Sequence, residues 1–369
     1  MKTQLKDEFM NDWERHWFMS FCENEEIDRI LSPKNAWDYL LQQRANIVAD
    51  NTRYLRVYIN KARIFPEWSF DKSFITVHYK EVLKHLSTAD EEFCKNIAYG
   101  DFFSNDANGY AEKNKEWGRI IYLNESLQFF MKFCNLALLD FKDRVPDRIK
   151  QNALRIAIRI MMKQEAMDFF MDPRGIVPED IGIKIHEPIK YELQFIAGHE
   201  FCHHLCGHFK DDDVSEKSVL SIGGNRYYKE IYNTSQSQEF EADIASIIRP
   251  KYNRQELCNL IEGALLWFIS LELSETAEGV VNPAVLYSVK THPLASERYN
   301  NIISNIDIPD EFDMNKIIKI RSNMEVLKEW IVQDLSCNYD MYDFYGSVYL
   351  DAPNTEWRGK ELIDRVDYY

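Results

Sequence analysis

The sequence predicts an α+β fold that is predominantly helical, in which a central helix packs on a small mixed sheet. Apolar stretches of helical length occur along much of the chain, whereas strand patterns are few and short. The clearest strand is the β-prone run GRIIYL, residues 118–123. Because 45% of the 369 residues are hydrophobic, the chain can bury a sizeable core.

The predicted elements group into three regions. Residues 1–115 form a mostly helical N-terminal region, in which TRYLRVYI at 52–59 is compatible with either a helix or a strand. Residues 116–305 form the main domain, and its segment NALRIAIRIMM at 152–162 is too densely apolar for an exposed helix, which predicts a core helix. Residues 306–369 are acidic and aromatic, and we expect a C-terminal extension packed on the body.

The central helix is predicted from Pro188 to Phe209, with the sequence IKYELQFIAGHEFCHHLCGHF after the proline. A loop follows it. A second helix is expected from about Ser237, and Pro250 ends it or lies just beyond it. Another apolar helix is predicted at 257–273.

Charge and composition exclude several classes of partner. The net charge is -16, so the overall field repels phosphate, and we expect neither nucleic acid nor anionic lipid as a partner. The longest apolar run, around 264–271, is far shorter than the roughly 20 residues of a membrane span, which predicts no membrane insertion. Seven scattered cysteines and a polar N-terminal stretch predict a cytoplasmic protein with reduced thiols. The oligomeric state is left open.

His199, Glu200 and His203 have the H-E-x-x-H spacing of a zinc site. Residues four apart lie on one helix face, so both imidazoles can bind one Zn²⁺ while Glu200 reaches the water beside it. Zinc lowers the pKa of that water from 15.7 to about 7, and Glu200 can then take its proton. Flanking apolar residues such as Phe195 and Phe201 indicate a buried helix, where these polar groups need a partner. The alternative is a pair of polar residues on a surface helix.

A catalytic zinc site needs a third protein ligand, and SQEFEADIAS at 237–246 offers one. Glu239 and Asp243 are four apart, so Glu239 can bind the metal while Asp243 accepts the free ring N–H of a ligand histidine. Glu241 competes for the role, but its partner four residues on is Ala245, which cannot orient a histidine. This argument favours Glu239. The alternative is an exposed acidic helix face.

Two further groups on the central helix were weighed as ligands. Cys202 and Cys206 are four apart and can mimic a soft, closed metal site, but they lie off the histidine face of the helix. We interpret them as small hydrophobic residues. His204 is interpreted as a polar residue at the helix edge.

The H-E-x-x-H sequence and the later E-F-E-A-D sequence at 239–243 resemble the gluzincin metallopeptidases. The chain is similar to the soluble relatives of the prenyl-protein and heat-shock membrane peptidases, since THPLASER at 291–298 resembles their T-H-P-x-x-x-x-R segment. It also resembles the Lit-like phage-exclusion peptidases, which share the H-E-x-x-H and G-H pattern. The resemblance covers roughly residues 116–305.

The resemblance implies a zincin-type domain with a resident Zn²⁺ and further site residues. His208 lies five residues after the second ligand, where the family often has a histidine, and it can cap the helix or orient a neighbour. His292 would be a fourth ligand or an oxyanion donor; the alternative is an ordinary loop histidine. Arg298 would anchor its segment near the site or form a plain salt bridge. Membrane substrates do not carry over, because the membrane-spanning helices of those relatives are not predicted in this chain.

These features predict a zinc-dependent endopeptidase that acts on a protein or peptide, with substrate main chain added along the sheet edge. A related hypothesis assigns one dedicated intracellular target and an activity that is latent until triggered. A hypothesis from another class is a zinc-stabilised interaction module, in which His292 closes a tetrahedral site and no water is activated.

Overall fold

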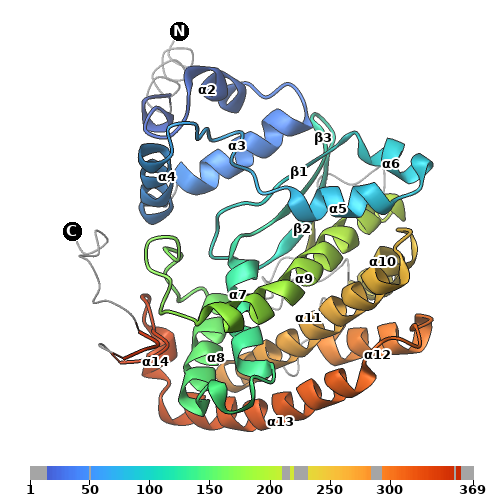
Figure 1. The fold of residues 1–369 in the computed structure, drawn as a ribbon. Coiled ribbons are helices and arrows are strands. Elements are labelled where there is room, and N and C mark those ends of the chain that lie inside the picture. Colours follow the sequence, from blue (N-terminus) through green and yellow to red (C-terminus); the bar gives the residue numbers. More distant parts are fainter. Residues whose placement is uncertain are drawn as a thin grey trace.

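Among the described residues the sheet has four short strands in the order β1-β3-β2-β4. β1, β2 and β3 are labelled in Figure 1. β1 runs parallel to β3, whereas β2 is antiparallel to both β3 and β4. This is a computed structural model, and it describes residues 15–49, 51–209, 217–219, 232–283, 293–352 and 355–358. The strand bounds are β1 Ile97–Tyr99, β2 Gly109–Asn114, β3 Gly118–Leu123 and β4 Lys217–Val219. The mixed sheet and the strand at 118–123 are therefore confirmed.

The two faces of β3 pack against different helices, as its alternating side chains require. Ile120 and Tyr122 belong to a small cluster with Ala36 and Leu40 of the N-terminal helix α3 (Ala36–Ala49). Ile121 and its neighbours belong instead to the main core, which includes the central helix α9 (Glu179–Leu205). The sheet thus lies between α3 and α9, which runs beneath it in Figure 1.

The N-terminal region is helical, as predicted, apart from β1 and β2. The ambiguous segment at 52–59 is a helix because the side chain of Asn51 accepts hydrogen bonds from the main-chain N–H groups of Arg53 and Tyr54. β1 and β2 precede residue 116, yet both pair with β3. The helices here are α2 Asn24–Leu31, α3, α4 Thr52–Ile64, α5 Val77–His85 and α6 Thr88–Cys94.

The helix α9 begins nine residues earlier than the sequence indicated, and Pro188 lies inside it. A proline removes one hydrogen bond and normally ends or kinks a helix. Here Ile181, Ile185 and Ile189 are all buried along one face, on both sides of the proline. Packing of that apolar face maintains the helix through Pro188, and the prediction of a start at this residue was wrong.

Helices fill the remainder of the main domain, and α11 packs closely against α9. A Cβ atom at Gly263 of α11 would lie 2.7 Å from the main-chain nitrogen of Glu192 and the main-chain carbonyl carbon of Tyr191, so the crossing requires glycine. These helices are α7 Ser126–Leu138, the 3₁₀ turn Lys142–Arg144, α8 Asp147–Met161, α9, α10 Tyr232–Ile248, α11 Arg254–Val281 and α12 Ala295–Asn305.

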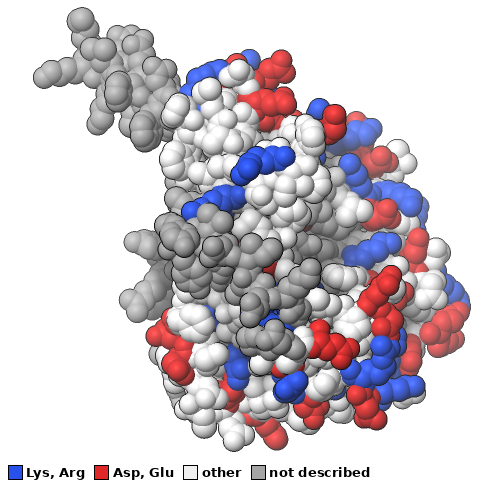
Figure 2. All heavy atoms as spheres, turned by 60° about the vertical axis from the view of Figure 1, so that its left-hand side comes forward, with Lys and Arg blue, Asp and Glu red and all other residues white. Residues whose placement is uncertain are grey.

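Among the described residues, α11 alone has the length and hydropathy of a membrane span. Its apolar window is 83% buried within the protein, and a core helix of a soluble protein meets the same criterion. The C-terminal helix α13 (Met314–Cys337) packs on α11, and the short α14 (Asp340–Asp343) packs on α8. Acidic and basic side chains are interspersed on the face drawn in Figure 2.

Candidate metal centre

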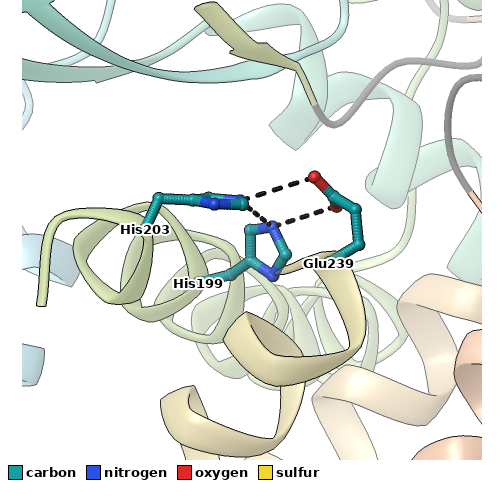
Figure 3. A group of neighbouring side chains, drawn as sticks. All are labelled: His199, His203 and Glu239. Carbon is teal, nitrogen blue, oxygen red and sulfur yellow. Dashed lines mark hydrogen bonds and ion pairs between the residues drawn. The ribbon is translucent and has the colours of Figure 1, made fainter. Parts of the chain in front are cut away.

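Two histidines of α9 lie side by side on a buried part of the helix (Figure 3). His199 and His203 are one helical turn apart, and their Nε2 atoms are 2.9 Å from each other. Both rings are almost completely buried, with exposed fractions of 0% and 2%. The helix therefore presents two imidazole nitrogens to one point inside the protein, as the four-residue spacing predicts.

Glu239 of α10 brings a carboxylate to the same point. Its Oε2 lies 3.3 Å from Nε2 of His199, and its Oε1 lies 3.5 Å from Nε2 of His203 (Figure 3). One ligand atom from each of the three residues falls within 4.8 Å of the others. The competing residue Glu241 lies elsewhere, with a side chain that is 61% exposed. The structure thus brings Glu239 to the histidines.

Asp243 and Arg298 lie on the Nδ1 side of the His199 ring and hold it in position. Oδ1 of Asp243 is 2.9 Å from Nδ1 of His199, on the ring edge opposite the candidate metal position. Arg298 of α12 donates from Nε to Oδ2 of Asp243 at 2.8 Å and from Nη2 to Oδ1 at 2.5 Å. Its Nη1 also lies 3.4 Å from Oε2 of Glu239. All of these groups are buried, so the bidentate pair fixes the position of Asp243 and the further contact places the same guanidinium beside Glu239.

His203 has its own support, from residues beyond the end of α9. Nδ1 of His203 lies 2.8 Å from Nδ1 of His208, and Nε2 of His208 lies 3.2 Å from Oε2 of Glu241. Gly207, with φ of +71°, turns the chain at the helix end and carries His208 back toward His203. Glu241 therefore contributes through His208, a contact that the sequence argument missed.

The donor set fits a divalent cation. A carboxylate only accepts hydrogen bonds, so His199 must direct its Nδ1–H to Asp243 and turn the lone pair of a neutral Nε2 toward His203 and Glu239. Two imidazole nitrogens and a carboxylate facing one point are the ligands that Zn²⁺ accepts.

The protonation of the metal-free site also indicates a position for a cation. Burial opposes a charge on His199, but its hydrogen bonds to Asp243 and Glu239 outweigh burial and raise the pKa of His199 to about 9. Burial, together with the charge on His199, holds the pKa of His203 well below its usual value. One proton on His199 thus supplies positive charge where a metal ion would supply it.

Glu200 lies beside this centre with its carboxylate unengaged. The side chain is fully buried, and neither oxygen has a hydrogen-bond partner within the described part of the chain. Burial raises the pKa of Glu200 to about 8; the charge on His199 opposes this rise, and Glu239 adds to it. With this pKa the Glu200 carboxyl carries its proton at neutral pH in the metal-free protein. A cation held beside it would lower the pKa, and the group could then accept and return a proton.

The strand β2 forms the wall next to Glu200. A Cβ atom at Gly109 would lie 2.9 Å from Oε1 of Glu200 and 2.7 Å from Cδ2 of Leu123. Glycine is therefore required where the strand passes the carboxylate. The sequence argument missed Gly109, because only pairing of β2 with β3 over α9 brings it to the site.

The remaining predicted residues lie in different places. His292 falls outside the described residues. Cys202 packs with Ala242 and Ala245 in a small apolar cluster. Cys206 is partly buried and forms a second group of possible ligands with His208 and Glu241. His204 stacks on Phe209 with ring centroids 4.6 Å apart and does not join the centre.

Comparisons of the chain with protein-family models, with curated protein sequences and with solved structures find no match in any of the three. The function must therefore be argued from the geometry of the centre.

Proposed function

We propose that the protein is a zinc-dependent endopeptidase that cleaves a protein or peptide substrate. The observation that carries the proposal is the position of Glu200, a buried and unengaged carboxylate on the same helix as two histidines that converge with Glu239. His199, His203 and Glu239 would hold the cation. A bound Zn²⁺ would polarise a peptide carbonyl and make water more acidic.

The chain's own residues then have separate tasks. Glu200 accepts a proton from the attacking water at a carboxylate oxygen and returns it to the amine of the leaving peptide. Asp243 holds His199 in the tautomer that leaves Nε2 free, and His208 accepts from Nδ1–H of His203 in the same way. Arg298 pairs with both Asp243 and Glu239 and so holds the two carboxylates in place.

A non-catalytic interaction module with a closed zinc site is the alternative. The near-complete burial of the three ligands suits such a site. An interaction module gives no role to Glu200, however. Burial of this carboxyl group costs free energy, and no hydrogen bond within the described residues compensates for it. The geometry therefore favours the peptidase. A dedicated intracellular target and a cytoplasmic location remain part of the proposal.

The test replaces the proposed base without changing the ligands. Glu200→Gln should retain one bound zinc per chain and lose at least about a hundredfold in the rate of cleavage of denatured casein or a peptide library. The matched control is Glu187→Gln, an exposed glutamate on the same helix, which should cleave as wild type does. Equal and measurable rates with and without Glu200→Gln, in wild type or in the opened variant described below, would refute the mechanism. Zinc held without any cleavage, even after the site is opened as described below, would favour the interaction module.

A further inference from the structure

The edge of β2 that lies beside the candidate metal centre is already occupied by β4. The register pairs Tyr110 with Val219, Ala111 with Ser218 and Glu112 with Lys217, in antiparallel orientation. Among the described strands β4 is the last on that side of the sheet, and its described part is three residues long. The main-chain groups that β2 would offer to another extended chain are therefore used by a segment of the protein itself.

This edge is next to the proposed reaction centre. Gly109, which faces the Glu200 carboxylate, immediately precedes the residues of β2 that pair with β4. α9, which carries Glu200 and both histidines, packs directly on β2. A polypeptide added along this stretch of β2 would have its main chain within reach of the centre, and it would need the hydrogen-bonding groups that β4 uses.

The centre is also closed to solvent. His199 and Glu200 are 0% exposed, and His203 and Glu239 are each 2% exposed. A peptide bond cannot contact groups that are buried to this extent, so part of the structure must move before a protein substrate can be cleaved. β4 is suited to moving, because within the described residues it pairs with the sheet on one side only and its ladder is short.

We propose that β4 is a built-in competitor of the substrate, which holds the peptidase in a latent state by occupying the edge of β2. Release of β4 frees this edge for an extended, unfolded segment of the substrate protein. The inference rests on the proposed peptidase function and adds a means of regulation to it. It predicts that weakening the β2–β4 ladder activates the protein.

The first test weakens that ladder through the main chain. Successive residues of a strand point their N–H groups to opposite edges, so prolines at both 218 and 219 must remove one bond to β2. Zinc-loaded Ser218→Pro/Val219→Pro should bind a fluorescent peptide hydroxamate at least about tenfold more tightly than wild type. It should also gain a similar factor in peptide cleavage. Ser218→Ala/Val219→Ala keeps both N–H groups and should stay within about twofold of wild type.

Amide hydrogen exchange is the second readout and does not need catalysis. In the double-proline variant the amides among 110–112 that face β4 should exchange faster than in wild type, whereas those that face β3 should not. The hydroxamate should protect the exposed amides again. Unchanged protection in α9 shows that the variant has kept its fold. If the variant fails this check, the milder Ser218→Gly/Val219→Gly pair is measured instead, with the same expected direction.

The outcomes separate the two proposals. Equal hydroxamate affinity and equal exchange at β2 in variant and wild type, with zinc bound to both, would overturn the competitor role of β4 and leave the metal site standing. Faster exchange and tighter binding without any cleavage by the opened variant would overturn the peptidase and retain the competition at the edge. Absence of bound zinc from wild type would overturn both.

Discussion

At the scale of single residues, the centre depends on which nitrogen of each histidine carries a proton. Asp243 accepts from one ring and His208 lies against the other, so the two Nε2 atoms are left to face Glu239. In the metal-free protein the pKa of His199 is about 9, because its hydrogen bonds to two carboxylates outweigh burial. Metal and proton therefore compete for the same nitrogen.

This competition predicts how zinc affinity varies with pH. Below pH 9 His199 is protonated in the metal-free protein, so zinc must displace one proton, and the dissociation constant should rise about tenfold for each unit that the pH falls. Competition with a chromophoric chelator between pH 7 and 8.5 measures the slope. A pH-independent affinity over this range would contradict the assignment.

Asp243→Asn provides the comparison for that experiment. Without the carboxylate, the pKa of His199 should fall, because a principal cause of its elevation is removed. The pH dependence of zinc binding should then weaken, while the affinity at pH 8.5 should drop by about 10- to 100-fold through loss of the orienting hydrogen bond. Glu241→Gln, at the exposed end of the His208 contact, should change the affinity much less.

At the scale of elements, α9 is placed by the sheet on one side and α11 on the other. The crossing with α11 depends on Gly263, where an added Cβ would strike the α9 main chain. A main-chain clash cannot be relieved by rotating a side chain, so the two helices would have to separate. The position of α9, and with it the histidine pair, is therefore sensitive to this one residue of α11.

Replacing Gly263 by alanine should lower the free energy of unfolding by roughly 1–3 kcal/mol, since overpacking outweighs the better helix propensity of alanine. Gly182→Ala is the matched control, because it lies in α9 with no atom within 4 Å of the added Cβ. The control should raise stability by up to about 1 kcal/mol. Urea denaturation of both variants measures the difference, and a stabilised Gly263→Ala would show that the crossing has room to spare.

The elements differ in how far local sequence determines them. The strand at 118–123 was predicted with the bounds of β3, because it contains the apolar, β-prone run at 120–123. The start of α9 was missed, since burial of Ile181 and Ile185 overrides the local effect of Pro188. β1 and β4 are each three residues long in the described chain, and their pairing with distant strands leaves little local signal.

The site was predictable where its residues repeat at helical spacing. His199 and His203, like Glu239 and Asp243, are four apart, and each pair lies on one helix face. Gly109 and the contact of Glu241 with His208 could not be predicted this way, because they depend on how separate elements pack. His292, expected from a resemblance, lies outside the described residues and stays a prediction.

At the scale of the whole molecule, the candidate centre joins helices from three parts of the chain. The two histidines come from α9 and Glu239 from α10, while Arg298 ties α12 to Asp243. A ligand that binds only the folded state stabilises all of the elements that form its site. Metal binding should therefore raise the free energy of unfolding of the whole protein, and not only order the residues around the site.

Zinc at about 100 times its dissociation constant should add about 2.7 kcal/mol to the free energy of unfolding. For a chain of 369 residues this corresponds to a rise in Tm of a few degrees. Differential scanning fluorimetry with and without zinc measures the shift. His203→Ala keeps the seven cysteines but removes a central ligand, so a similar rise in that variant would assign the stabilisation to other sites.

Gly109 of β2 limits how the surroundings of Glu200 can change in the course of evolution. Since a Cβ at Gly109 would collide with the carboxylate and with Leu123, the wall next to Glu200 consists of bare main chain. Main chain has the same chemical groups whatever the residue, so this side of the candidate centre cannot be altered by substitution. Divergence in what the centre accepts must come from the other residues around it, while this wall keeps a constant shape and polarity.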